Sequence, residues 1–147
     1  MRHRRSCVLL AVALVLVACG PGASASAATI TIGDAWARPA PAGGQSAAYL
    51  TIANTGAAAD ALLSVSSPVA DMVGLHQTST DAAGVTGMRP VARLEIPAGG
   101  SALLEPGGYH VMLMGLTGEL AVGKTIELDL TFEHAGRVVV SATIRQG

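Results

Sequence analysis

The chain has 147 residues, of which 50% are hydrophobic and 13% charged, and its formal net charge is −1 at pH 7. This length fits one domain, and the composition provides ample apolar side chains for a core. After the first five residues the basic side chains are few and scattered. A nucleic-acid-binding domain collects Lys and Arg on one face, so the composition excludes a nucleic-acid partner.

The first residues are typical of an export signal. Three arginines within residues 1–5 precede an apolar run over residues 7–18, which is too short to span a membrane comfortably. The run ends in Leu16-Val-Ala-Cys19, which resembles a bacterial lipobox. That resemblance implies a signal peptide over residues 1–18, lipid on Cys19, and an extracytoplasmic lipoprotein anchored to a membrane of the cell envelope or periplasm. The alternative is an ordinary secretory signal cut between residues 23 and 27, with Cys19 incidental.

Residues 19–28 are mostly Gly, Ala and Ser, and they predict a flexible tether because they can bury little surface. We expect the folded domain to occupy residues 29–147. This region contains no cysteine, so it can form no disulfide. It also lacks the thiolate ligand of a blue-copper electron-transfer site, which excludes that class of protein.

Short runs of β-forming residues, separated by Gly, Pro and Asn turn signals, follow one another to the C-terminus. No long segment shows the period of a helix, although one short helical turn is compatible with residues 116–123. The pattern predicts an all-β domain, an antiparallel sandwich or barrel. The predicted strands are 29–32, 35–38, 46–53, 60–66, 69–77, 88–96, 101–104, 109–116, 125–133 and 137–145.

The predicted strand over residues 109–116 places three distinctive side chains on one face. Side chains alternate along a strand, so His110, Met112 and Met114 point the same way. Neighbours on that face are about 7 Å apart, which lets a thioether and an imidazole reach one ion. Met114 is twice as far from His110, and we assign it to packing. Methionine also fills gaps in apolar cores, so this strand alone leaves a purely structural role open.

A second histidine and methionine favour a metal site. Eleven residues separate His76 from Met88, twenty-one separate Met88 from His110, and Met112 follows. Imidazole and thioether without thiolate form a soft, neutral ligand set that selects Cu(I). We therefore predict that these four side chains bind Cu(I). The chain contains no G-x-S-x-G or H-E-x-x-H motif, which favours a binding protein over an enzyme.

The other distinctive residues receive structural interpretations. We expect Met72 in the core or behind the ligands, and Trp36 and Tyr109 in packing. We expect His134 on the surface, beside a turn.

Short segments spread along the chain carry a family resemblance. They are Trp36-Ala-Arg-Pro39, Ala48-Tyr-Leu-Thr-Ile52, Leu75-His76, Gly87-Met-Arg89, Ile96-Pro-Ala-Gly99, the stretch from Leu104 to Leu116 and the alternating stretch from Gly123. Together they resemble the PCuAC family of bacterial extracytoplasmic Cu(I)-binding chaperones over nearly all of residues 29–144. The family pattern is His, about ten residues, Met, twenty-one residues, then His-x-Met. This chain has one extra residue in the first gap, which we expect a polar loop to absorb.

The resemblance implies a cupredoxin-like Greek-key β-sandwich with an exposed Cu(I) site at His76, Met88, His110 and Met112. It implies a copper chaperone rather than an enzyme. The implied partner is a copper-receiving apo-protein, either a cytochrome c oxidase subunit or another copper chaperone. Copper sequestration for resistance needs the same site and stays open, as does a non-metal, Ig-like scaffold lipoprotein.

Overall fold

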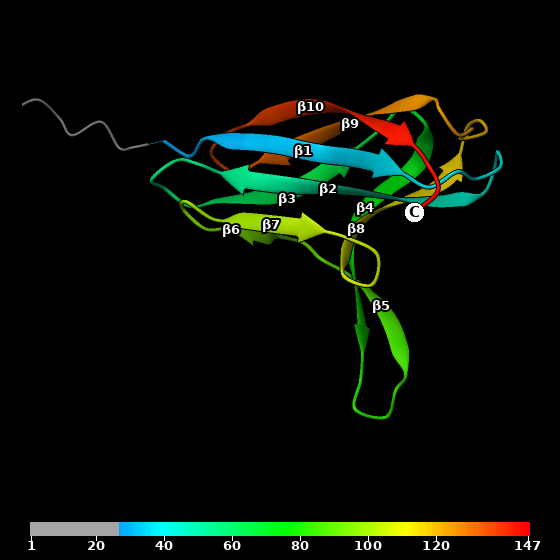
Figure 1. Cartoon of the computed structure of the whole chain (residues 1–147), viewed down its shortest axis with the longest axis horizontal. Helices are drawn as coiled ribbons and strands as arrows, with labels where there is room; N and C mark the ends of the chain where they lie inside the picture. Colours follow the sequence, from blue (N-terminus) through cyan, green and yellow to red (C-terminus); the bar gives the residue numbers. More distant parts are fainter. Residues whose placement is uncertain (1–26) are drawn as a thin grey trace, which may run out of the picture.

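The structure is a computed structural model that describes residues 27–147 (Figure 1). The predicted signal peptide, Cys19 and the tether as far as residue 26 lie outside the described residues. Ala27 and Ala28 lie against Gly56, where an added Cβ would clash with their backbone. Within residues 27–147, no helix is long and apolar enough to cross a membrane.

Ten β-strands and no helix make up the described residues, which confirms the predicted all-β class. The predicted strands 60–66, 101–104 and 109–116 occur with the predicted bounds. The strands are β1 (Ile30–Ala37), β2 (Gln45–Asn54), β3 (Asp60–Ser66), β4 (Ala70–Thr80), β5 (Thr86–Pro90), β6 (Leu94–Ile96), β7 (Ser101–Leu104), β8 (Tyr109–Leu116), β9 (Thr125–Phe132) and β10 (Arg137–Ile144).

The strands form one hydrogen-bonded order, β5-β4-β8-β7-β2-β1-β10-β9-β3-β6, in which β8 also pairs with β2. Most neighbours are antiparallel, as predicted, but β1 with β10 and β7 with β8 are parallel. The order folds over on itself, so side chains of β2 and β8 share one apolar cluster with those of β3 and β9. Leu50 and Val111 from one half, and Leu62 and Leu128 from the other, are at most 2% exposed. The core therefore lies between two layers, as in a β-sandwich.

The predicted strands 29–32 and 35–38 are one continuous strand, β1. The turn signal between them, Gly33-Asp34, does not reverse the chain. At Asp34, φ is 48°, and the register with β2 shifts between Gly33 and Trp36. The Gly33-Asp34 pair therefore makes a β-bulge within a continuous strand.

Two further differences follow from strand pairing. The predicted strand 88–96 is two strands, because β5 pairs with β4 whereas β6 pairs with β3 in the other half of the sheet. Residues 116–123 contain no helical turn, and Leu120 instead bridges Ala40.

β4 and β5 form a hairpin that projects from the body of the sandwich (Figure 1). β4 runs to Thr80, past its predicted end at residue 77, so much of the predicted polar loop is paired strand. Asp81 stabilises the turn by accepting hydrogen bonds from the backbone N–H groups of Ala83 and Val85, both at 2.9 Å. Gly84, with a φ of 80°, provides the left-handed conformation that this turn requires. The hairpin thereby returns the chain toward the sheet at Met88.

Candidate metal centre

Three of the four predicted ligands lie on one face of the β4–β8 pair. His76 of β4 is the direct cross-strand partner of His110 of β8. Directly opposed side chains of antiparallel strands share a face, as do residues two apart on one strand, so Met112 joins them. The main core uses the opposite face of β8, where Val111 and Leu113 are fully buried. The candidate ligands are therefore outside the main core.

The β4–β5 hairpin adds Met88 to this face. Met88 is the cross-strand partner of Thr78, which lies two residues beyond His76 and points the same way. The next pair lies on the reverse face, where Arg89 donates a hydrogen bond to Oε1 of Gln77 at 2.9 Å. The hairpin register therefore turns the thioether, rather than the guanidinium, toward the histidines.

His110 is oriented with one ring nitrogen toward Met88. Its Nδ1 lies 3.2 Å from the carbonyl oxygen of Gly108, and because a carbonyl can only accept, Nδ1 carries the proton. In the neutral imidazole the free electron pair is then on Nε2. Nε2 lies 3.2 Å from Sδ of Met88, which has no proton to donate. The contact brings together two atoms that both offer electron pairs.

This contact between His110 and Met88 has the dimensions of two ligands on one metal ion. With metal bonds of about 2.0 Å to nitrogen and about 2.3 Å to sulfur, atoms 3.2 Å apart subtend an angle of about 95°. Such an angle, somewhat below tetrahedral, leaves room for further ligands. Metal-bound histidines usually donate their second ring N–H to a fixed acceptor, and the Gly108 carbonyl lies where such an acceptor would be for His110.

His76 places a second imidazole beside the first. The ring centroids of His76 and His110 are 6.0 Å apart, and the ring planes differ by 21°. Nδ1 of His76 is buried and has no hydrogen-bond partner within residues 27–147. A buried polar atom without a partner costs about 1–3 kcal/mol. A metal ion bound to this nitrogen would provide the partner, so the donor set fits Cu(I).

Gly74 makes room for the ring of His76. A Cβ on Gly74 would lie 3.3 Å from Cε1 and 3.7 Å from Nδ1 of that ring. The unpartnered nitrogen of His76 therefore lies over the glycine. Gly74 is also the cross-strand partner of Met112, so this nitrogen is turned toward the part of the face that Met112 occupies.

Exposure increases from the base of this centre to its rim. His110 is 4% exposed, Met112 is half-buried and Met88 is 56% exposed. The paired strands β4 and β8 hold the histidines, whereas the exposed thioether is on the projecting hairpin. An incoming ligand could therefore reach an ion here from the hairpin side without opening the sandwich.

The ring of Tyr49 lies beside His110 and packs against the ring of Trp36. The ring centroid of Tyr49 is 6.5 Å from that of His110 and 4.6 Å from that of Trp36. The guanidinium carbon of Arg145 lies 4.9 Å from the Trp36 ring centroid and covers it. Trp36 is buried, as predicted, but it packs with Tyr49 outside the main apolar cluster.

Sequence reasoning missed several contributors to this centre. It assigned no role to Tyr49, to the Gly108 carbonyl or to Gly74. For Gly74 a signal was available, because a glycine two residues before a candidate ligand shares the ligand's face and leaves space there. The carbonyl of Gly108 and the ring of Tyr49 have no comparable signal, since backbone direction and long-range packing decide their positions.

Met72 is not where the sequence placed it. It is 61% exposed, so the expected core position is wrong. Met72 is the cross-strand partner of Met114 and lies on the face of β4 that is turned away from the main core. Met114 lies two residues beyond Met112 on β8. His134 is on the surface as predicted, with a 61% exposed side chain, and its Nε2 lies 3.5 Å from a carboxylate oxygen of Glu133.

Carboxylates make no alternative metal centre. Residues 27–147 contain no group of three or more His, Cys, Asp or Glu side chains that could hold a metal ion. The thioethers are therefore needed to complete a ligand set in this part of the chain.

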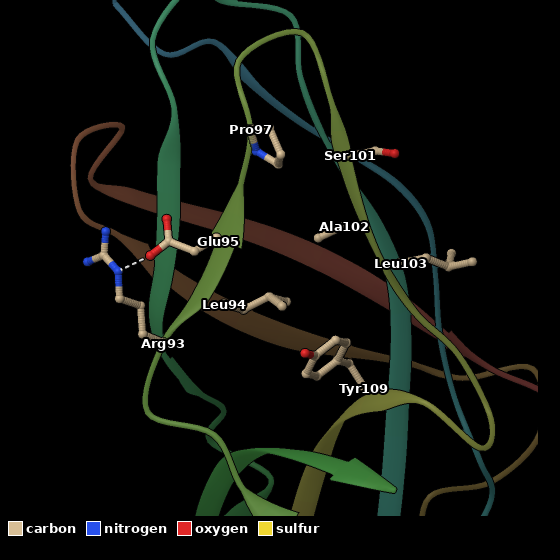
Figure 2. A pocket seen from close by; sticks show the side chains of 8 residues that line it. All are labelled: Arg93, Leu94, Glu95, Pro97, Ser101, Ala102, Leu103 and Tyr109. Atoms are coloured by element: carbon tan, nitrogen blue, oxygen red, sulfur yellow. Dashed lines mark hydrogen bonds and ion pairs between the residues drawn. The ribbon is translucent and has the colours of Figure 1, made fainter. Parts of the chain in front are cut away.

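A separate open groove lies between β6 and β7 (Figure 2). Its volume is about 480 Å³. Arg93 flanks it through an ion pair with Glu95, which Figure 2 shows, and a second ion pair with Glu133 at 2.6 Å. None of the four candidate ligands lines the groove, so it is distinct from the metal centre. Its lining residues are Arg93, Leu94, Glu95, Pro97, Ser101, Ala102, Leu103 and Tyr109.

Comparison with known proteins identifies the family. The family model described as "Putative lipoprotein LpqE-like" matches residues 30–144, which include all ten strands. The chain belongs to this LpqE-like family. A curated relative in Leifsonia xyli subsp. xyli (strain CTCB07), "Putative lipoprotein Lxx21020", is 31% identical over 116 residues, which cover 79% of this chain and 69% of the relative.

Solved structures similar to this LpqE-like chain are PCuAC domains. The copper-bound PCuAC domain from PmoF2 is 26% identical, with 83% of this chain and 97% of that chain covered and a TM-score of 0.66. The solution structure of CuI-DR1885 from Deinococcus radiodurans is 36% identical, with 85% and 84% covered and a TM-score of 0.64. These similarities confirm the predicted resemblance to the PCuAC family and the cupredoxin-like β-sandwich.

Proposed function

We propose that this protein is an extracytoplasmic Cu(I) carrier that binds the ion through His76, Met88, His110 and Met112. The observation that carries the proposal is the 3.2 Å contact between Nε2 of His110 and Sδ of Met88. The copper-bound PmoF2 domain and CuI-DR1885, which share the fold, support the choice of copper, and the second supports its reduced state.

The ligand chemistry favours Cu(I) over divalent ions. Two neutral imidazoles and two thioethers leave a net charge of +1 with Cu(I) and +2 with Zn(II) or Cu(II). Keeping the higher charge in a partly buried site without an anionic ligand costs more free energy. Thioether sulfur is also a soft ligand, which selects Cu(I).

Delivery, rather than storage, is the proposed use of the bound copper. The support is the 56% exposure of Met88, because an exposed ligand can be replaced by a ligand of a docking protein. The receiving protein in this proposal is an apo-protein such as a cytochrome c oxidase subunit or another copper chaperone. Deletion should lower oxidase activity and added copper should restore it. A strain that instead becomes only copper-sensitive would indicate sequestration.

The proposal includes a lipid anchor at Cys19. The lipobox-like segment before Cys19 supports it, as do the lipoprotein descriptions of the matching family and of the relative from Leifsonia xyli. Lipid at this position would hold the domain at the outer side of a membrane through the segment preceding Ala27.

The binding proposal is tested by anaerobic titration of the purified protein with Cu(I) against a chromophoric Cu(I) chelator. Native mass spectrometry gives the stoichiometry. We expect one tightly bound Cu(I), with Zn(II) bound far more weakly in the same competition format. Equal affinities for the two ions, or unchanged Cu(I) binding in a His110→Ala variant, would overturn the proposal.

A further inference from the structure

The face that carries the candidate ligands continues beyond them to a second pair of thioethers. Along β8, His110, Met112 and Met114 lie on this face in order, each two residues apart. Met114 is opposite Met72 of β4 on one side and opposite Gln45 of β2 on the other. In this row of the face, two methionines are therefore direct neighbours.

The row between the two histidines and the two outer methionines contains only one large side chain. Met112 is opposite Gly74 on β4 and opposite Ala47 on β2. The ring of His76 lies over Gly74, so Met112 is bordered by an imidazole on one side and by the methyl group of Ala47 on the other. The long, flexible side chain of Met112 can turn toward His110 or toward Met114.

The outer methionines do not serve as core packing. Met72 is 61% exposed and Met114 is half-buried, whereas Leu113 on the reverse face of β8 is fully buried. Directly opposed residues of antiparallel strands have Cβ atoms about 5 Å apart. Two methionine side chains at that separation can bring both sulfurs to a metal bond length of about 2.3 Å from one ion.

We propose that Met72, Met114 and Met112 form a second, all-thioether Cu(I) site that adjoins the histidine-containing site and shares Met112 with it. This inference rests on the proposed function, because the shared ligand links the two positions. The second site is weaker, since it lacks both imidazoles and has the exposed Met72 in its ligand set. An ion moves between the sites by ligand substitution: bonds to His76, His110 and Met88 break, bonds to Met72 and Met114 form, the bond to Met112 is kept, and copper remains Cu(I).

Copper can therefore occupy two adjacent positions along this face rather than one. The first position is next to the hairpin with Met88, and the second is next to the exposed Met72. A partner could then receive copper at Met72 while the hairpin end stays in place.

The test uses the purified protein labelled with ¹³C at the methionine methyl groups and titrated anaerobically with Cu(I). We expect the first equivalent to shift the methyl signals of Met88 and Met112. The second equivalent should shift those of Met72 and Met114, with a dissociation constant at least about tenfold weaker than the first. Native mass spectrometry should show two copper ions at saturation, when Met112 stays with the first ion and Met72 and Met114 hold the second.

Three variants separate the sites. Met72→Leu and Met114→Leu preserve side-chain volume and should abolish the second equivalent while changing the affinity of the first less than about twofold. As a control, Leu63→Met places a new exposed thioether on β3, where Leu63 is 41% exposed, and should bind no additional copper.

Each outcome decides between the two proposals. Saturation at one equivalent, with the Met72 and Met114 signals unmoved, overturns the second site and leaves the carrier function standing. Loss of the first equivalent in Met72→Leu or Met114→Leu would place these residues in the main site and also overturn a separate one. No binding of Cu(I) at all would overturn the proposed function and the second site together.

Discussion

Nε2 of His110 and Sδ of Met88 lie 3.2 Å apart although their strands, β8 and β5, do not pair with each other. β4 lies between these strands and pairs with both, so the side chain of Met88 must reach across β4 to make the contact. The hairpin register places Met88 on the histidine face, and the turn at Asp81 maintains that register. The proposed site therefore depends on a hairpin as well as on four ligands.

Replacing Met88 by leucine should weaken Cu(I) binding by at least about 10- to 100-fold, the range that supporting residues of metal sites already produce. The fold should be unaffected, because Met88 is 56% exposed and leucine has a similar volume. Competition with a chromophoric Cu(I) chelator measures the change. Val85→Ala, in the turn of the same hairpin, is the matched control and should bind as the unaltered protein does. A loss of less than twofold for Met88→Leu would remove Met88 from the ligand set.

Gly74→Ala should weaken Cu(I) binding without unfolding the protein. The new Cβ would lie 3.3 Å from Cε1 of His76, so the ring must turn or shift from its position over the glycine. The same substitution at Gly87 has no atom within 4 Å to disturb and is the control. Chelator competition measures the affinity, and the NMR signals of the His76 ring report its displacement. Equal affinities for the two variants would show that Gly74 does not shape the site.

The class of the fold was predictable because strand periodicity is a local property of the chain. The alternation of Thr125–Phe132 is visible in the sequence, and β9 has these bounds apart from the predicted final residue 133. The pairing of strands was not predictable from such patterns. Whether residues 88–96 are one strand or two depends on β4 and β3, which lie far away in the sequence.

The ligand types were predictable from residue chemistry, but their mutual positions were not. The sequence placed His110 and Met112 on one face because both belong to one strand. It could not show that His76 is the cross-strand partner of His110, since that relation depends on the register between β4 and β8. The exposure of Met72 was mispredicted for a similar reason, because alternation tells which side chains share a face but not which face the core covers.

Cys19→Ser should release the protein from membranes while leaving Cu(I) affinity unchanged. Cys19 precedes all ten strands and all four proposed ligands, so its loss should not alter the domain. Membrane fractionation followed by chelator competition on the released protein measures both effects. Retention of the variant in the membrane fraction would contradict lipid attachment at this cysteine.

The buried carboxylate of Asp60 should make the stability of the fold depend on pH in acid. Its side chain is only 1% exposed. Its carboxylate accepts hydrogen bonds from the backbone N–H groups of Ala61, His134 and Ala135, at 2.7, 2.9 and 2.8 Å. Burial acts to raise the pKa of Asp60, but these three donors outweigh it and hold the pKa below its ordinary value. The carboxylate thereby anchors the β9–β10 turn to the start of β3.

Asp60→Asn should lower the free energy of unfolding at pH 7 by about 2 kcal/mol, because an amide places an NH₂ group against backbone donors. The folded pKa is depressed, so the stabilisation is fully present above the unfolded pKa of about 3.9 and is lost as pH falls through the folded value. Denaturant unfolding without copper should therefore show a constant difference between the unaltered protein and the Asp60→Asn variant from about pH 7 to about pH 5, and a narrowing difference as pH falls below the unfolded pKa of about 3.9. Asp34→Asn is the control: Asp34 is exposed, asparagine tolerates its positive φ, and stability should change little. A difference that stays constant with pH would show that the Asp60 carboxylate does not stabilise the fold through its charge.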